Sequence, residues 1–386
     1  MRIVLTCNFS PWSPYSGGGQ RSTHSLATAL VREGHDVNVV FTRTPWERFA
    51  VPRVEYQLHW ASFFGLKSRR AAPLRPLNAL SVLGAVQALH QKHRLDVVHG
   101  NGEEVVLAAI WGRKAGVPVV TTPRYPNYPA PLLQAEGASR AAWLRLAITD
   151  PKYLLLGRAA RASTWCCPTS EHAARLVERA LGVETAKIAV IPNGVSGTFF
   201  EHEWTLPSSA PLLFFGRLAH DKGVDTLLQA LARDPGERRL VVVGRGDQGP
   251  ALRRMANELG LGERVVWRDW LDEAELALAL SRCKLAVLPS RHESFGNAMA
   301  EAMAVGAPLV STRAGSIPEI VEHEVTGLLV PPDDATALHQ AITRLEHDTG
   351  LAQRLGSAGR QRMQASFSWP AIARRYARLY GERPRS

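Results

Sequence analysis

The chain has 386 residues, enough for two medium-sized domains, each with its own core. Hydrophobic residues at 45% and charged residues at 21% are ordinary for a globular protein, and no apolar run reaches the length of a membrane span. The formal net charge of +11 lies wholly in residues 1–195, which carry 23 Lys and Arg against 12 Asp and Glu, since residues 196–386 carry 23 of each. This asymmetry favours an anionic membrane surface as a partner of the first half, with solvated arginine-rich helices as the alternative. It does not favour nucleic acid, because no recognition motif accompanies the charge.

The amino-terminal residues and the cysteines indicate where the protein works. Residues 1–7 have too short an apolar core for a secretory signal and fit a buried strand. The four cysteines, Cys7, Cys166, Cys167 and Cys283, form neither a CxxC pair nor a cluster with metal-ligand spacing. We expect four buried thiols, no metal site and a cytoplasmic protein that can lie peripherally on the inner face of the plasma membrane.

Short apolar runs alternate with helical patterns along the chain. The runs predict strands over residues 3–7, 37–41, 97–99, 117–121, 163–168, 212–215, 240–243, 264–267, 285–289 and 308–311. The patterns between them predict helices over residues 20–33, 171–180, 224–231, 250–259, 272–281 and 297–304. This alternation is typical of parallel sheets covered on both faces. We therefore expect an α/β protein with two doubly wound, Rossmann-like domains that face each other across a cleft and are joined between residues 193 and 211.

The first motif is a glycine run at residues 17–19, immediately before the predicted helix 20–33. Glycines without side chains let the backbone approach a phosphate closely, so the amides of Gly18 and Gly19 are candidates for an anion site. Glycine runs are also common in flexible turns, and this motif alone is weak.

The second motif spans residues 214–223, where a strand, a loop and a helix follow one another. Arg217 and Lys222 bracket the loop, and Gly223 opens the helix. Two cations beside a helix N-terminus can neutralise a diphosphate, with the arginine fork and the lysine point charge in separate roles.

The third motif, at residues 244–249, is a literal GxGxxG between a strand and a helix, with Asp269 at a suitable distance. It predicts dinucleotide binding, so an NAD(P)-dependent enzyme is an alternative. That alternative gives no role to Arg217 and Lys222, or to Glu293 and Glu301 of the fourth motif below. A nucleotide-sugar site uses all four residues.

The fourth motif places Glu293 in the loop after the apolar run 285–289 and Glu301 inside the following helix. Free backbone N–H groups at the N-terminus of that helix would lie between the two carboxylates. This arrangement predicts a seat for a diphosphate, with one carboxylate on a sugar and the other on ribose hydroxyls.

Taken in order, these motifs resemble family 4 of the retaining GT-B glycosyltransferases. The resemblance also includes residues 190–195, 301–310, 315–319 and 327–330, and it covers nearly the whole chain. It implies a GT-B fold with an acceptor-binding domain over residues 1–193, a donor-binding domain over residues 194–368, and a final helix over 369–386 that packs back on the first domain.

The resemblance also implies roles for individual residues. Arg217 and Lys222 would hold the donor diphosphate, Glu293 would contact the sugar, and Glu301 would bind the ribose. The phosphate cradle and the base site would draw on backbone groups, namely those of Gly18, Gly19, Gly244, Arg245, Ser294, Phe295, Gly296 and Asn297. No metal ion or other cofactor is expected, because fixed cations can stabilise the departing anion.

One departure from the family concerns the strand that precedes the acceptor loop. Many relatives have a histidine there, whereas this chain has Arg124. An arginine cannot act as a neutral base, but it can bind a phosphate or carboxylate, so we expect an anionic acceptor site. His24 and His99 are alternatives for a histidine in the cleft, and a structural role for His99 is equally well supported.

The resulting expectation is a retaining, metal-independent hexosyltransferase. It would move a sugar from a UDP- or GDP-sugar to a hydroxyl of a lipid-linked or cell-envelope glycan. A soluble small-molecule acceptor, an NAD(P)-dependent enzyme and a catalytically silent nucleotide-sugar sensor are the alternatives.

Overall fold

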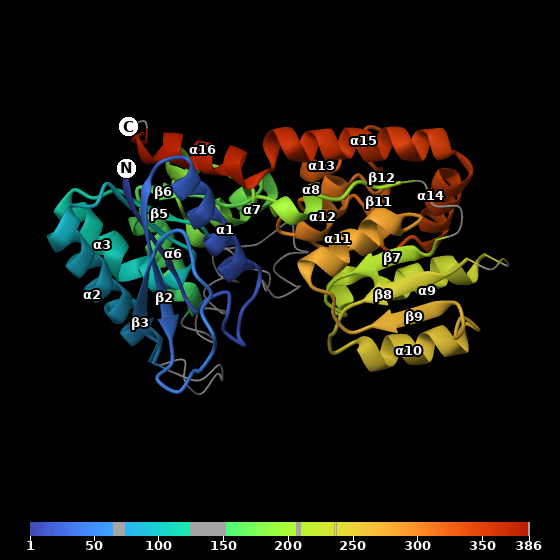
Figure 1. The fold of residues 1–386 in the computed structure, drawn as a ribbon, viewed down its shortest axis with the longest axis horizontal. Coiled ribbons are helices and arrows are strands. Elements are labelled where there is room, and N and C mark those ends of the chain that lie inside the picture. Colours follow the sequence, from blue (N-terminus) through green and yellow to red (C-terminus); the bar gives the residue numbers. More distant parts are fainter. Residues whose placement is uncertain (65–73, 124–151, 206–209, 235, 237, 385–386) are drawn as a thin grey trace. The chain divides into compact units, whose positions relative to one another are not determined.

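The computed structural model describes residues 1–64, 74–123, 152–205, 210–234, 236 and 238–384, and these residues form two compact units (Figure 1). The first unit contains the described residues up to Gly194 and those from Trp369 onward. The second unit contains the described residues from Val195 to Ser368. The observed boundary lies one residue from the expected one, and helix α16 (Trp369–Tyr380) belongs to the first unit.

A six-stranded parallel sheet forms the centre of the first unit, in the order β3-β2-β1-β4-β5-β6. Its strands are β1 (Arg2–Cys7), β2 (Asp36–Arg43), β3 (Gln57–Ser62), β4 (Val97–Gly100), β5 (Val119–Thr121) and β6 (Trp165–Cys166). Its other helices are α1 (Gly18–Arg32), α2 (Arg75–His93), α3 (Val106–Ala115), α6 (Lys152–Ala162) and α7 (Glu171–Leu176).

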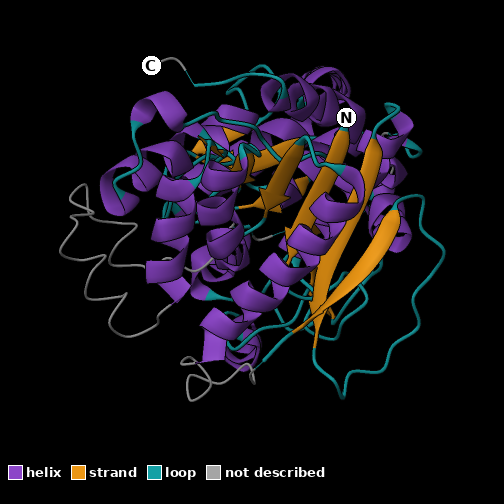
Figure 2. Cartoon of the chain, turned by 90° about the vertical axis from the view of Figure 1, so that its left-hand side faces the viewer, coloured by secondary structure: helices purple, strands orange, loops and turns teal. Residues whose placement is uncertain are grey.

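Alternate residues of the central strand β1 point to opposite faces of this sheet. Ile3 and Leu5 pack in one buried cluster with residues of α1 and α16, whereas Val4 packs in another with residues of α2 and α3. Side chains in a strand alternate with a period of two, so an unbroken apolar strand is explained by helices on both faces. Figure 1 and the side view in Figure 2 show these helices flanking the strands.

The second unit has its own six-stranded parallel sheet, in the order β12-β11-β10-β7-β8-β9. Its strands are β7 (Leu212–Phe215), β8 (Leu240–Val243), β9 (Val265–Arg268), β10 (Ala286–Leu288), β11 (Leu309–Thr312) and β12 (Leu328–Val330). Its helices are α8 (Gly197–Phe200), α9 (Val224–Ala232), α10 (Gly249–Glu258), α11 (Glu273–Arg282), α12 (Asn297–Val305), α13 (Ile317–Ile320), α14 (Ala335–His347) and α15 (Thr349–Ser366).

Each sheet reverses its direction of winding once. In the first unit the chain winds outward from β1 to β3 and then in the other direction from β4 to β6. In the second it winds from β7 to β9 and then in the other direction from β10 to β12. Because crossovers are right-handed, the helices that follow strands on one side of the reversal cover one face of the sheet, and those that follow strands on the other side cover the opposite face. The loops after β1 and β4 in the first unit, and after β7 and β10 in the second, therefore diverge at the carboxyl edge of the sheet. The predicted α/β class with two doubly wound sheets is confirmed.

The strands absent from the sequence prediction are β3 and β12, which both lie at a sheet edge. Strand β3 is half-exposed and includes polar residues, so it does not form the buried apolar run that marks an inner strand. Strand β12 is buried and apolar, but its run is only three residues long, between Gly327 and Pro331, which is too short to stand out in the sequence. Helix α1 begins two residues before the predicted start, at Gly18. Predicted helix 171–180 ends as α7 at Leu176 and continues as a π turn to Leu181.

The expected burial of the thiols is confirmed, because all four cysteines are buried and unbridged. Burial raises the pKa of Cys166 and of Cys283 to about 12, so neither is a thiolate at neutral pH. No helix in the described ranges is long and apolar enough to cross a membrane.

Candidate functional site

The loops that follow β7 and β10 meet at the winding reversal of the second unit. Arg291 N–H donates to the carbonyl of Asp221 at 2.8 Å, which joins the two loops. Gly223, with φ of +66°, lies so close to the Pro289 carbonyl that an added Cβ would be 2.1 Å from its oxygen. Only glycine fits this contact, which explains the residue that ends the second sequence motif.

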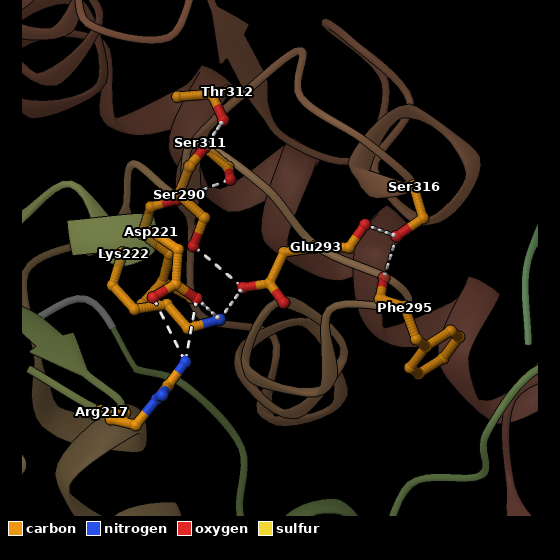
Figure 3. Close-up of polar contacts among 10 residues, drawn as sticks. Arg217, Asp221, Lys222, Ser290, Glu293, Phe295, Ser311, Thr312 and Ser316 are labelled. Atoms are coloured by element: carbon orange, nitrogen blue, oxygen red, sulfur yellow. Dashed lines mark hydrogen bonds and ion pairs between the residues drawn. The ribbon is translucent and has the colours of Figure 1, made fainter. Parts of the chain in front are cut away.

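An ion cluster occupies this junction, as Figure 3 shows. Lys222 Nζ donates to Glu293 Oε1 at 2.7 Å, and Ser290 Oγ donates to the same oxygen at 2.9 Å. Arg217 Nη2 lies 3.2 Å from both carboxylate oxygens of Asp221, and Lys222 Nζ lies 3.6 Å from Asp221 Oδ2. The structure therefore brings together three of the predicted residues, Arg217, Lys222 and Glu293. It adds Asp221 and Ser290, which the sequence reasoning missed.

The members of the cluster differ in their exposure. The Lys222 and Glu293 side chains are 20% and 13% exposed, whereas Arg217 is 50% exposed. A lysine on a flexible stem can leave its carboxylate for a ligand anion, and an exposed guanidinium can reach the same anion from solvent. The cluster can thus present two cations to an incoming diphosphate and leave one carboxylate beside it.

The backbone of Glu293 is held from the opposite side by Ser316. Ser316 N–H and Oγ–H donate to the Glu293 carbonyl at 3.1 and 3.0 Å, and Oγ also contacts the Phe295 carbonyl at 2.9 Å. Gly315, with φ of +56°, allows this approach, because a Cβ there would lie 2.4 Å from the Glu293 oxygen. These bonds fix the loop that carries the carboxylate.

The predicted helix after Glu293 is present as α12, which starts at Asn297 after a left-handed Gly296 with φ of +103°. Asn297 is exposed, and Glu301, one turn further, is half-buried. Ser294 is also half-buried, but the ring of Phe295 lies in the core, 6.2 Å from that of Phe367. Phe295 can therefore offer only its backbone to a ligand, as expected for an amide at a helix N-terminus.

Arg291 is a third residue that the sequence reasoning missed, and it ties the site loop to two acids. Its Nη1 and Nη2 donate to the two oxygens of Asp225 at 2.8 and 2.7 Å, and its Nε donates to Asp333 at 2.6 Å. Partial burial by itself raises the pKa of Asp225, but the hydrogen bonds from Arg291 outweigh it and the pKa is lowered. No sequence signal marks this triad, because its members come from the first turn of α9 and from two loops that are far apart in sequence.

The GxGxxG loop has a structural explanation within the protein. A Cβ on Gly244 would lie 1.8 Å from the Gly216 oxygen, and one on Gly246 would lie 2.1 Å from the Leu218 oxygen. The glycines therefore allow this loop to pack on the loop after β7. Arg245 is largely exposed, with Asp269 at 3.6 Å.

The winding reversal of the first unit gathers a polar cluster around the N-terminus of α1, which contains Gly18 and Gly19. Gln20 Nε2 donates to the Asn8 carbonyl at 2.6 Å, and its Oε1 accepts from Gly17 N–H at 3.0 Å. From the loop after β4, Asn101 Nδ2 donates to Thr23 and to the Gly19 carbonyl. The amides predicted to complete a phosphate cradle thus lie in different units, and their joint role stays a prediction.

Glu104 lies beneath this cluster and is fully buried. Its Oε1 accepts from Asn101 N–H at 2.9 Å and from Thr6 Oγ at 3.1 Å. Burial, reinforced by the charge of Glu103, raises the pKa of Glu104 from 4.5 to about 8. Because the folded-state pKa is the higher one, the stability that this carboxyl contributes is complete below pH 4.5 and is lost as the pH rises through about 8.

Glu104→Gln should remove this pH dependence, because the amide resembles the protonated acid. Wild-type protein should lose stability relative to the variant between pH 4.5 and about 8, by at most about 1.4 kcal/mol per pH unit. Urea denaturation of both proteins across that range measures the difference. A difference that does not change with pH would show that Glu104 titrates normally.

The two candidate histidines have structural contacts. His99 is buried, and its ring nitrogens lie 2.7 Å from the Tyr380 hydroxyl and 2.7 Å from Thr122 Oγ1. His24 Nδ1 lies 2.8 Å from the Tyr56 hydroxyl. These contacts favour the structural interpretation of His99. Arg124, the predicted anion-binding residue, lies outside the described residues.

The two adjacent acids at residues 333–334 have separate structural roles. Asp334 Oδ1 accepts from Ala337 N–H at 2.8 Å and caps α14, while Asp333 contacts Arg291. In the ranges that the structure describes, no group of three or more His, Cys, Asp or Glu side chains could hold a metal ion.

Comparisons with known proteins extend over both units. Residues 17–194 match the family described as Glycosyl transferase 4-like domain, and residues 204–362 match Glycosyl transferases group 1. Glycogen synthase of Mycobacterium tuberculosis is 29% identical over 94% of this chain and 91% of its own. Sucrose-phosphate synthase from Thermosynechococcus elongatus is 25% identical with a TM-score of 0.77, over 98% of each chain. Anabaena Alr3699/HepE, solved in complex with UDP-glucose, has a TM-score of 0.72 at 20% identity, over 99% of this chain and 100% of its own, a likeness of fold.

Proposed function

Because the chain belongs to the GT-B glycosyltransferases of the family 4 type, we propose that it transfers a sugar from a nucleotide-diphosphate donor with retention of configuration. The observation that carries this proposal is the Lys222–Glu293 pair beside Arg217, at the winding reversal of the second unit and before the N-terminus of α12. Ligands bind at such reversals in open parallel sheets. Two cations and the amides at a helix N-terminus suit a diphosphate, and a partly buried carboxylate beside them suits a sugar.

In the proposed complex each residue has a distinct task. Arg217 and Lys222 hold the diphosphate and stabilise the negative charge that grows on it as the sugar leaves. Glu293 contacts the sugar, Ser290 and Ser316 keep its loop in place, and Glu301 binds the ribose hydroxyls. Amides of residues 294–297 complete the phosphate site, and Gly244 and Arg245 lie in the loop proposed for base recognition.

The proposed acceptor is a hydroxyl of a lipid-linked or cell-envelope glycan, with a soluble small molecule as the alternative. The basic first half supports a protein that works in the cytoplasm, peripherally on an anionic membrane. Leu74, Leu77 and Leu80 are exposed at the start of α2 and would add apolar contact with lipid. Arg124 is proposed to bind an anionic group of the acceptor.

A thermal-shift panel of UDP, GDP, ADP, their sugars and NAD(P) tests the donor. One nucleoside diphosphate at about 100 times its dissociation constant should stabilise the protein by about 2.7 kcal/mol. Arg217→Ala should abolish most of this shift, whereas Arg282→Ala, on the exposed end of α11, should preserve it. Stabilisation by NAD(P) alone would overturn the proposal and restore the GxGxxG alternative.

The same protein provides a test of the chemistry. With the donor so identified, transfer should continue after treatment with EDTA, because Arg217 and Lys222 supply the positive charge at the diphosphate. Nuclear magnetic resonance of the product should show the anomeric configuration of the donor. Loss of activity on chelation with recovery on Mg²⁺ addition would refute metal independence, and the opposite anomer would refute retention.

A further inference from the structure

A pocket of about 960 Å³ opens at the carboxyl ends of β2 and β3 in the first unit. Its lining includes the last residue of β2, Arg43, the turn that contains Glu47, Arg48 and Phe49, and Trp60 near the end of β3. None of the sequence motifs covers these residues, and the proposed donor site lies in the other unit.

The two arginines are held in place by groups that do not neutralise them. The guanidinium of Arg43 lies over the Trp60 ring, 4.9 Å from its centroid. Arg48 Nη1 donates to the carbonyls of Pro45 and Glu47 at 2.9 and 3.1 Å. In the described part of the chain neither arginine forms an ion pair. An oriented, unneutralised arginine presents its remaining N–H groups to a ligand, unlike a surface arginine paired with an acid.

The carboxylate that precedes Arg48 in the sequence, that of Glu47, accepts hydrogen bonds from residues other than the two arginines. Glu47 is buried, and its Oε1 accepts from Ser13 Oγ at 2.5 Å. Its Oε2 accepts from Thr44 N–H and Oγ1 at 2.6 and 3.1 Å. The acid therefore fastens the pocket wall to the β1–α1 loop, which leads to Gly18 and Gly19.

Aromatic rings form a second part of the lining. Trp60 and Phe49 lie 5.8 Å apart between centroids, and both are half-buried, so part of each remains accessible. Indole and phenyl faces suit the C–H surface of a sugar ring, whereas a phosphate alone gains nothing from them. Cations and aromatic faces in one pocket fit a ring that carries an anionic group.

We propose that this pocket binds a sugar or cyclitol bearing a phosphate or carboxylate, with Arg43 and Arg48 on the anion and Trp60 and Phe49 on the ring. The identification of this ligand as the acceptor rests on the proposed transferase function. The binding of the ligand to the pocket is independent of that function, because it is measured without any donor.

Titration calorimetry of the full chain with glucose 6-phosphate, mannose 6-phosphate, inositol 1-phosphate and glucuronate tests the pocket. At least one should bind, and Arg43→Gln and Arg48→Gln should each weaken it about tenfold or more, about 1.4 kcal/mol. Arg53→Gln, an exposed arginine outside the lining, should bind as wild type. Inorganic phosphate and methyl glucoside should bind more weakly than the best anionic ring.

The outcomes separate the parts of the proposal. Absence of binding by all four ligands, or binding unaffected by Arg43→Gln and Arg48→Gln, overturns it. Inorganic phosphate binding as tightly as the anionic ring overturns the aromatic part. Arginine-dependent binding in a protein that transfers no sugar from any donor supports the pocket and refutes the transferase proposal.

A vesicle arm identifies the source of the ligand. Retention of the protein is compared on phosphatidylcholine vesicles that contain or lack phosphatidylinositol. Only the first kind presents an inositol phosphate as a lipid headgroup. Arginine-dependent retention on the phosphatidylinositol vesicles supports a lipid-linked ligand. Equal retention on both vesicle types, together with arginine-dependent calorimetry, supports a soluble one.

Discussion

Lys222→Met should lower the rate of sugar transfer by about 10²- to 10³-fold, the usual effect of removing one group that stabilises charge in a transition state. The variant lacks the ammonium that now lies 2.7 Å from Glu293 and that we expect to move to the donor diphosphate. It should also bind the nucleoside diphosphate product more weakly. Initial rates at saturating donor and calorimetry with the diphosphate measure the two effects.

Two variants make this result specific. Glu293→Gln removes the carboxylate but no cation, so it should slow transfer by a similar factor and leave diphosphate affinity nearly unchanged. Lys284→Met replaces a lysine outside the ion cluster and should behave as wild type. If Lys222→Met transferred sugar at the normal rate, the assignment of this cluster to the reaction would be wrong.

Gly223→Ala should destabilise the protein and inactivate it. A side chain at φ of +66° is strained, and its Cβ would lie 2.1 Å from the Pro289 oxygen, so the loops after β7 and β10 must separate. Strain and overlap together should lower the free energy of unfolding by about 3 kcal/mol. The separation should also displace Lys222 from Glu293. Thermal denaturation and transfer rates measure the two losses.

Gly260→Ala provides the matched control. Gly260 has a similar φ of +69°, but no atom lies within 4 Å of the position of its Cβ. This variant carries the conformational strain without the overlap, so it should lose only about 1 kcal/mol and stay active. Equal losses of unfolding free energy in the two variants would mean that the overlap with the Pro289 carbonyl contributes nothing to the destabilisation.

Sequence patterns were sufficient for the sheets wherever strands are buried on both faces. Such strands appear as continuous apolar runs, and all ten predicted strands correspond to observed ones. The edge strand β3 lacks that pattern because it is half-exposed, whereas β12 is buried and apolar but too short a run to be recognised. Pairing and burial, rather than intrinsic preference, define them.

The candidate site shows a similar division. Glycines and charges in loops after strands indicated Arg217, Lys222 and Glu293, since parallel topology brings such loops to one edge. Asp221 and Ser290 contact Arg217 and Glu293 within their own loops, at spacings that belong to no motif, and the contacts of Arg291 join segments that are far apart in sequence, so none of the three was recognised. The pocket around Arg43 and Trp60 was missed for the same reason, since a β2 end and a β3 end form it jointly.

The return of the chain to its first unit has a consequence for biosynthesis. Ile372 and Tyr376 of α16 share a buried cluster with Ile3 and Leu5, and Tyr380 contacts His99. Since synthesis proceeds from the N-terminus, the ribosome has completed the whole of the second unit before it makes these residues. The first sheet must wait with one apolar face incompletely covered, so the domain translated first cannot complete its native packing until residues 369–380 have been made. During that interval the uncovered apolar face of the first sheet can bind chaperones or aggregate with other chains.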